Sequence, residues 1–447
     1  MSDQMLILVA LAGIFLLLFL VIRTKLHAFV ALLLVSLIVG ILAGMPLNEV
    51  VTSMQNGMGG TLGFVAVVVG LGAMFGQMLE VSGGAERLAQ TLVKKFGEDK
   101  SQWALGVTGF LVAIPVFFDV GFIILVPIVY GLAKKTGKSL LYYGIPLLAG
   151  LAVTHSFIPP TPGPIAVADL IGADLGWVIL FGTIAGIPAM IIAGPLFAKY
   201  ISKKLHVVVP DYMNLEEIEY DKELPSFKLI ASLIMIPLVL ILLNTVSGVL
   251  LEEGNIVRSI LTFLGHPFVA LTIATILTFV FLGTKRGYSR QEVQDIATKA
   301  LEPAGIIILV TGAGGVFKQI LIDSGVGQVL GDMMAGSALP PILLAFLIAA
   351  AVRVAQGSAT VSMVTAAGLM APLIEILGLQ GPVLGLLVIA IASGATVLSH
   401  VNDSGFWLVG RYFGLSVKDT LKSWTVMETL IGLVGVTVAL ILGVFIG

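Results

Sequence analysis

The sequence contains no cysteine, and only 11% of its 447 residues are charged, whereas 58% are hydrophobic. The absence of cysteine excludes disulfides, thiol catalysis and metal sites built from cysteine. Soluble chains carry about 25% charged residues, so a composition this apolar leaves no room for a sizeable soluble domain. The chain also lacks a nucleotide-binding motif, which argues against a pump driven by ATP.

Apolar segments long enough to cross a bilayer recur along the whole chain. A spanning helix needs roughly 20 apolar residues. The first apolar run is too long for the core of a signal peptide and has no small-residue cleavage site after it, so we interpret it as a retained span. Clear spans are predicted at 5–22, 26–44, 61–80, 176–198, 227–247, 264–283, 303–322 and 426–446.

Four further apolar segments, 101–133, 142–172, 339–373 and 382–412, carry polar or glycine-rich interruptions. Basic loops stay on the cytoplasmic side. With the N-terminus outside, 21 of the 24 Lys and Arg residues fall inside, provided that 101–133 and 339–373 each leave the membrane on the side they entered. We therefore predict that 101–133 and 339–373 are re-entrant hairpins and that 142–172 and 382–412 are broken helices. The backbone can turn within the membrane only where protein or a water-filled cavity provides hydrogen bonds for its polar groups.

The two halves of the chain match each other in sequence. The segment 27–32 pairs with 266–271, and 70–79 pairs with 312–321, at separations of 239 and 242 residues. If the hairpins do not cross the membrane, an odd number of spans separates the matching segments, so the second half is inverted. Inverted repeats with broken helices are the architecture of secondary transporters. The expected fold is thus an all-α integral membrane protein of this class.

The repeat divides the chain into four parts. They are a first span (1–25), repeat 1 (26–205), a cytoplasmic linker with a connecting span (206–262) and repeat 2 (263–447). In this alignment the hairpin tip 117–121 corresponds to 353–357, and the break 160–163 corresponds to 402–405. In inverted-repeat transporters such interruptions meet near the middle of the membrane and form the binding site.

Three ionisable residues lie at these interruptions, and an ionisable group inside a membrane is a functional hypothesis by default. Asp119 is a candidate proton carrier, or a structural partner of a backbone amide or of Arg353. Arg353 is a candidate for binding a substrate carboxylate in a bidentate fork, or for a permanent ion pair with an acidic residue. Asp403 could carry the proton or cap a helix, and sequence does not rank it against Asp119.

The remaining candidates surround these three residues. His155 and His400 flank the two breaks and could relay protons, although a hydrogen-bonded structural histidine is the reading we favour for each. Hydroxyl and amide groups suit sugar hydroxyls, and helix N-termini at the breaks attract anions. The further candidates for substrate binding are Thr161, Gly163, Gly357, Ser358, Thr360, Asn402 and Ser404. We predict no catalytic residue and no metal site.

At these residues the sequence resembles the gluconate permease family of proton symporters, over essentially the whole chain. The family is similar in architecture to the larger ion-transporter superfamily, which pairs a dimeric scaffold with a mobile domain. The sequence departs from many members at Thr161, where they have histidine, and at Asp119, where glutamate is frequent. The resemblance rests on Phe117-Phe118-Asp119-Val120-Gly121-Phe122, on 155–164, on Gly357-Ser358-Ala359-Thr360-Val361 and on 399–407.

The resemblance implies import of gluconate or a closely related sugar acid by proton symport. It further implies a homodimer in the inner membrane, contact with the lipid bilayer, an elevator-like motion and no cofactor other than the coupling proton. No nucleic-acid partner is expected. The alternatives are a sodium-coupled carrier of another small organic anion and a permease for D-serine or a hydroxy acid. An enzyme is disfavoured, because no nucleophile–base pair or metal cluster is evident.

Overall fold

The computed structural model describes residues 3–97, 100–210, 223–326 and 339–446. Part of the predicted cytoplasmic linker, 211–222, lies outside the described residues. Within the described residues all regular secondary structure is helical, and eight helical stretches are long and apolar enough to cross a membrane. The prediction of an all-α membrane protein is therefore confirmed.

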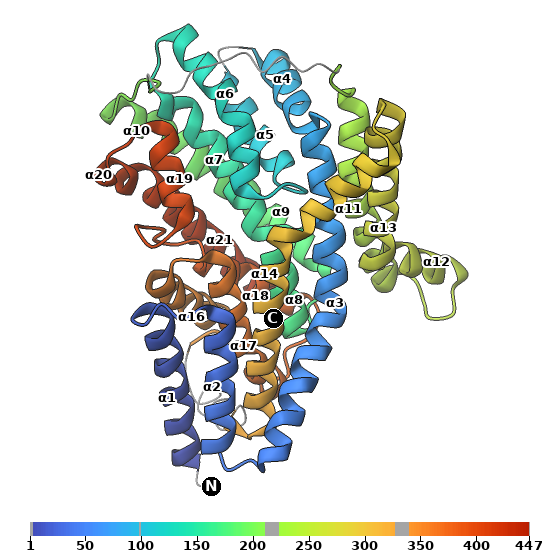
Figure 1. Ribbon diagram of the computed structural model, residues 1–447, viewed down its shortest axis with the longest axis vertical. Helices are drawn as coiled ribbons and strands as arrows, with labels where there is room; N and C mark the ends of the chain where they lie inside the picture. The colour runs from blue at the N-terminus through green and yellow to red at the C-terminus, as the bar shows by residue number, and fades with distance from the viewer. Residues whose placement is uncertain (1–2, 98–99, 211–222, 327–338, 447) are drawn as a thin grey trace.

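The first half of the molecule forms one long helix, a hairpin and a broken helix, joined by shorter elements (Figure 1). Its helices are α1 (Asp3–Ile22), α2 (Ala28–Leu42), α3 (Leu47–Val81), α4 (Gly84–Phe96), α5 (Ser101–Val112), α6 (Phe118–Thr136), α7 (Leu140–Phe157), α8 (Pro162–Ile171), α9 (Leu175–Ile191), the π-helical η2 (Ile192–Leu196) and α10 (Phe197–Lys204).

The second half begins with a connecting helix and then repeats this order. Its described elements are α11 (Phe227–Leu250), α12 (Ile256–Gly265), α13 (Pro267–Thr278), η3 (Phe279–Gly283), η4 (Thr284–Arg286), α14 (Arg290–Asp323), α16 (Pro341–Gln356), α17 (Ala359–Ile376), α18 (Pro382–Gly394), α19 (Ser404–Phe413), α20 (Val417–Thr420), η5 (Leu421–Thr425) and α21 (Val426–Ile446).

The helices α3 and α14 form the central pair and lie side by side along the length of the molecule (Figure 1). They contain 35 and 34 residues, which at 1.5 Å per residue is about 50 Å each. Small residues let the two backbones approach: a Cβ added at Gly57 would lie 2.5 Å from the carbonyl oxygen of Gly315. Both helices begin well before the predicted spans 61–80 and 303–322. Their first turns are more polar, so a search for apolar segments does not include them.

The inverted repeat is visible in the helix ends as well as in the sequence. Nδ1 of His27 accepts a hydrogen bond from the amide of Phe29 at 3.3 Å, and Nδ1 of His266 accepts one from Phe268 at the same distance. The two histidines thus cap α2 and α13 in the same way, which agrees with a structural role for both. At the other ends of the repeats, α8 and α19 both stop at a left-handed glycine.

Both predicted hairpins and both broken helices are present. In the first hairpin α5 and α6 are joined by residues 113–117, so Asp119 lies in the first turn of α6 rather than in the connection. In the second hairpin, α16 continues through Gln356 and the chain turns at Gly357, where φ is +92°. Arg353 therefore lies in the last turn of α16, and its predicted position within the tip itself is wrong.

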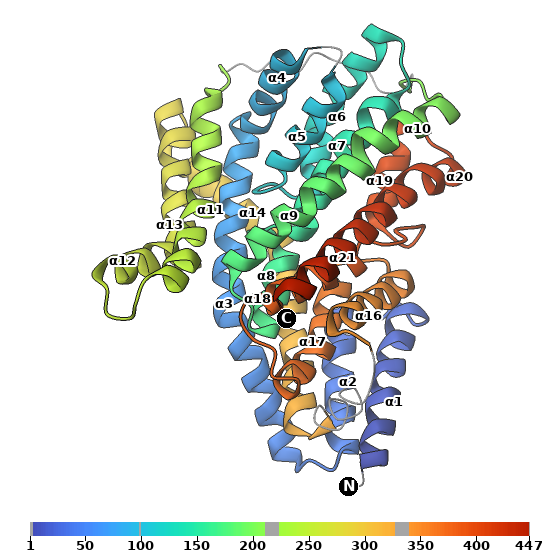
Figure 2. The same cartoon turned by 180° about the vertical axis from the view of Figure 1, so that it is seen from behind.

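The two breaks differ in length. The first spans 158–161, between α7 and α8, close to the prediction. The second is longer than predicted, because α18 already ends at Gly394 and α19 begins at Ser404. Seen from behind, α9 and α21 run beside each other across the face of the molecule (Figure 2).

Gly76 on α3 provides a test of this packing. A Cβ at Gly76 would overlap the carbonyl oxygen of Pro115 in the first hairpin, whereas a Cβ at Gly63 on the same helix would meet nothing within 4 Å. Alanine favours a helix over glycine by about 1 kcal/mol, but overpacking costs typically 1–3 kcal/mol. We expect Gly76→Ala to lower the melting temperature of the purified protein and Gly63→Ala to leave it unchanged or raise it. Equal behaviour of the two variants would contradict the close approach.

Candidate functional site

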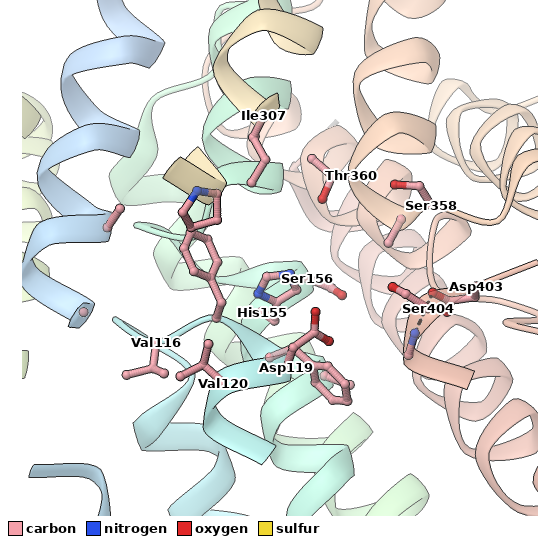
Figure 3. Close-up of a pocket in the computed structure, with 18 of the residues that line it drawn as sticks. Val116, Asp119, Val120, His155, Ser156, Ile307, Ser358, Thr360, Asp403 and Ser404 are labelled. Carbon is pink, nitrogen blue, oxygen red and sulfur yellow. Dashed lines mark hydrogen bonds between the residues drawn. The ribbon is translucent and has the colours of Figure 1, made fainter. Parts of the chain in front are cut away.

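A cavity of about 520 Å³ lies where the two hairpins meet the second broken helix. This volume is within the range of about 300–1,000 Å³ that is usual for small-molecule sites. Its walls come from both halves of the chain, namely from α3, α6 and α7 of the first half and from α14, α16, α17, α19 and α21 of the second. Figure 3 shows Asp119 and His155 on one side of the cavity and Ser358, Asp403 and Ser404 on the other.

An ion pair between Arg353 and Asp403 joins the second hairpin to the second broken helix. Nη2 of Arg353 lies 2.5 Å from Oδ2 of Asp403, and the two side chains are only 3% and 12% exposed. Nη1 of Arg353 also donates a hydrogen bond to the carbonyl oxygen of Gly357. Of the two alternatives for Arg353, the structure therefore shows the ion pair; binding of a substrate carboxylate stays a prediction.

Asp403 is held by a network as well as by the ion pair. Its Oδ1 accepts a hydrogen bond from the amide of Gly405 at 3.1 Å, which makes Asp403 the N-cap of α19. Its Oδ2 accepts a second hydrogen bond from the hydroxyl of Ser399, and that hydroxyl accepts one from Nε1 of Trp424 at 2.6 Å. Each partner fixes the next, so the carboxylate has little freedom to move alone.

Gly357 makes the junction of hairpin and broken helix possible. Its positive φ is a conformation that side chains with a Cβ rarely adopt, and a Cβ there would overlap the carbonyl oxygen of Asn402. Nδ2 of Asn402 donates to the carbonyl oxygen of Val354 at 3.0 Å, and Nε2 of His400 lies 3.0 Å from the same oxygen. The end of α16 is thus bonded to the second break at several points.

Hydroxyl and amide groups line the cavity around this junction. Buried polar groups in proteins are normally hydrogen-bonded, yet Oε1 of Gln356 and Oδ1 of Asn402 have no partner among the described residues. Each could accept a hydrogen bond from a hydroxyl of a ligand. The further hydroxyl and amide side chains of the lining are Gln77, Ser156, Ser358, Thr360 and Ser404.

The charges of the lining are unequal. Four carboxylates, those of Glu80, Asp119, Asp403 and Glu428, line the cavity. Arg353 is the one Lys or Arg side chain among the described lining residues, and Asp403 already pairs with it. With every carboxylate ionised, the cavity is negatively charged, and an anionic ligand is repelled unless a cation enters with it.

The predicted site residues do not all meet at this cavity. Asp119, His155, Arg353, Gly357, Ser358, Thr360, Asn402, Asp403 and Ser404 line it. Thr161 is buried elsewhere and donates to the carbonyl oxygen of Ile158 at 2.6 Å. Gly163 faces Met363, and His400 is bonded to the end of α16. Roles for Thr161, Gly163 and His400 in binding or proton transfer stay predictions without a place in the cavity lining.

Several residues of the cavity were not predicted from the sequence, chief among them Glu428 and Glu80. Each lies near one end of an apolar segment that was predicted as a clear span. A single acidic residue within such a segment is the feature of the sequence that could have identified it as a candidate. Gln77, Gln356 and Trp424 were missed as well. They are ordinary residues for a helix, and only the fold brings them to the cavity.

Removal of the charge of Asp403 tests the ion pair. Asn is as good an N-cap as Asp, so Asp403→Asn keeps the cap and removes only the charge. Loss of one partner of a buried pair typically costs about 3–5 kcal/mol, and we expect a clear fall in the melting temperature. The control is Glu253→Gln, which breaks the exposed contact with Arg258 at 3.9 Å; its melting temperature should hardly change. Similar small effects for both variants would contradict a structural role of the pair.

Comparison with known proteins agrees with this architecture. The family described as "GntP family permease" matches residues 5–445. The low-affinity gluconate transporter of Escherichia coli (strain K12) is 45% identical over 441 residues, which cover 99% of both chains. The gluconate permease of Pseudomonas aeruginosa is 42% identical over 443 residues, which cover 98% of both chains.

Among solved structures, the chain is similar to the YdaH transporter of Alcanivorax borkumensis, whose crystal structure has an unusual topology. The TM-score is 0.68 at 14% sequence identity, and the match covers 93% of this chain and 98% of that one. At this identity the likeness shows the fold and nothing about the ligand.

Proposed function

Since the chain belongs to the GntP family of permeases, we propose that it imports gluconate or a closely related sugar acid together with a proton. The observation that carries the proposal is the cavity between the two hairpins, with a guanidinium at its wall and hydroxyl and amide groups around it. Relatives that match over nearly the full length are named as gluconate transporters, which supports the substrate class.

The lining suits a molecule with one carboxylate and several hydroxyls. A guanidinium binds a carboxylate through two parallel hydrogen bonds, and Nε of Arg353 is buried without a partner among the described residues. The unpartnered oxygens of Gln356 and Asn402 and the nearby hydroxyls can bond to a polyol chain. Arg353 would have to share its guanidinium between Asp403 and the incoming carboxylate.

The charge of the cavity supports coupling to a cation. A sugar acid is an anion at neutral pH, and more carboxylates than guanidinium groups line its proposed site. Binding of a proton to one of these carboxylates removes a negative charge that would otherwise repel the substrate. Proton entry and substrate entry then favour each other, as reciprocal coupling requires.

The position of the site between the halves fits transport by alternating access, in which one part of the molecule moves against the other. The cavity is lined by α3 and α14, by both hairpins and by α19. A location in the inner membrane, as the family resemblance implies, belongs to this proposal. The homodimer and the elevator-like motion implied by the same resemblance stay predictions.

Uptake by proteoliposomes tests the function and the role of Arg353 together. We expect an inward proton gradient, without sodium, to drive accumulation of labelled gluconate, and a protonophore to abolish it. Arg353→Ala should lose at least about 100-fold in uptake, because both the substrate contact and the ion pair with Asp403 disappear. The matched control is Arg258→Ala, outside the cavity, which should transport normally.

Other outcomes would overturn the proposal in distinct ways. Uptake that follows a sodium gradient and ignores the pH gradient would contradict proton coupling. No gluconate uptake by a correctly inserted protein, with uptake of D-serine or of a hydroxy acid instead, would contradict the substrate. Normal uptake by Arg353→Ala would contradict the assignment of that residue alone.

A further inference from the structure

Glu428 is a buried carboxylate of the cavity that was not among the site residues predicted from the sequence. It lies in the first turn of α21, its residue is 4% exposed, and it lines the cavity beside Trp424. Its side chain makes no hydrogen bond or ion pair with the rest of the described chain. An ionised carboxylate without a partner is costly to bury, and the described chain supplies no hydrogen-bond or ion-pair partner that would compensate this one.

The groups that face Glu428 come from several elements. Arg353 on α16 and Asp403 before α19 both act on it electrostatically, and His155 on α7 and Asp119 on α6 line the same cavity. The other elements packed against α21 are α9, α18, η2 and η5. The first three contain no ionisable side chain, and Lys422 of η5 is exposed. Arg353 is thus the cation that acts on Glu428, and it already forms an ion pair with Asp403.

The other carboxylates of the cavity are bound or open to water. Asp403 pairs with Arg353. Glu80 accepts a hydrogen bond from Gln77 at 2.9 Å and interacts electrostatically with Lys299. Asp119 is exposed to the cavity. Of the four carboxylates, only that of Glu428 is both buried and without a hydrogen-bond or ion-pair partner among the described residues.

From this arrangement we infer that Glu428 is the site at which the coupling proton binds. The inference rests on the proposed function and names the residue that carries out its coupling. When Glu428 is ionised, Asp403 and Glu428 compete for Arg353, and a substrate carboxylate would be a third anion. When Glu428 takes up a proton, one negative charge disappears, and the guanidinium of Arg353 becomes available to the substrate.

The transport step balances with one proton. The proton comes from water on the side to which the cavity is open and bonds to a carboxylate oxygen of Glu428, which becomes a neutral acid. After the cavity opens to the other side, the substrate leaves and the proton returns to water there. No bond of the substrate is made or broken, and no other reactant is needed.

The test compares Glu428→Gln with the wild-type protein in three measurements. Gln has nearly the shape of a protonated Glu but cannot titrate. We expect Glu428→Gln to bind gluconate with an affinity that no longer depends on pH, whereas the wild-type affinity should change by up to about tenfold per pH unit. The variant should still exchange internal for external gluconate, and it should lose accumulation driven by a proton gradient.

Two further variants make the result specific. Asp169→Asn removes an acid of α8 that lies near Lys318 and outside the cavity lining, and it should keep proton-driven accumulation. Glu428→Asp keeps a titrating group in a displaced position, and it should keep accumulation with a shifted pH profile. If Glu428→Gln fails to insert, the Asp variant decides: an unchanged pH profile would overturn the inference.

The failure of this inference is distinct from failure of the proposed function. Proton-driven accumulation by folded Glu428→Gln would show that another group binds the proton, and the wild-type result would still support symport. Wild-type protein that transports gluconate without any proton dependence would instead overturn the coupling as a whole, and Glu428 with it.

Discussion

The ion pair between Arg353 and Asp403 holds together the two elements that form the cavity. It joins the last turn of α16 to the N-cap of α19, and both side chains are nearly buried. Gly357 lets the hairpin approach the break closely enough for the pair to form, and Ser399 orients the carboxylate. Because a buried pair is costly to break, a ligand that competes for the guanidinium must offer an anionic group of its own. The same interaction thus stabilises the empty site, and in the proposed function it is the one with which the substrate carboxylate would compete.

Much of the architecture could be predicted from sequence, because a membrane restricts what a chain can do. Apolar length located the spans, the basic residues required two segments to return to their side of entry, and polar interruptions marked both breaks. The repeat then assigned Asp119, Arg353 and Asp403 to interruptions that are expected to meet near the middle of the membrane. The helix caps at His27 and His266 repeat this symmetry in atomic detail. These signals are local or periodic, so one sequence was enough to find them.

The parts that sequence could not supply are contacts between distant segments. Nothing local shows that Arg353 pairs with Asp403, 50 positions further on, or that Thr161 turns away from the cavity to bond the carbonyl oxygen of Ile158. Glu428 was hidden for a different reason: a span with one acidic residue near its end still has the hydropathy of a span. The function of a carboxylate in such a place cannot be predicted from the sequence pattern, because it depends on which residues surround it in the fold.

The central claim is that substrate and proton cross the membrane together. Proton movement can be measured directly, as a change in the pH inside the vesicles. Proteoliposomes with wild-type protein and an internal pH indicator, at equal pH inside and outside, would receive an inward gradient of unlabelled gluconate. The account predicts that the lumen becomes acidic, to an extent that saturates with gluconate and is absent without the protein. Transport of gluconate with no change in internal pH, in tight vesicles, would contradict it.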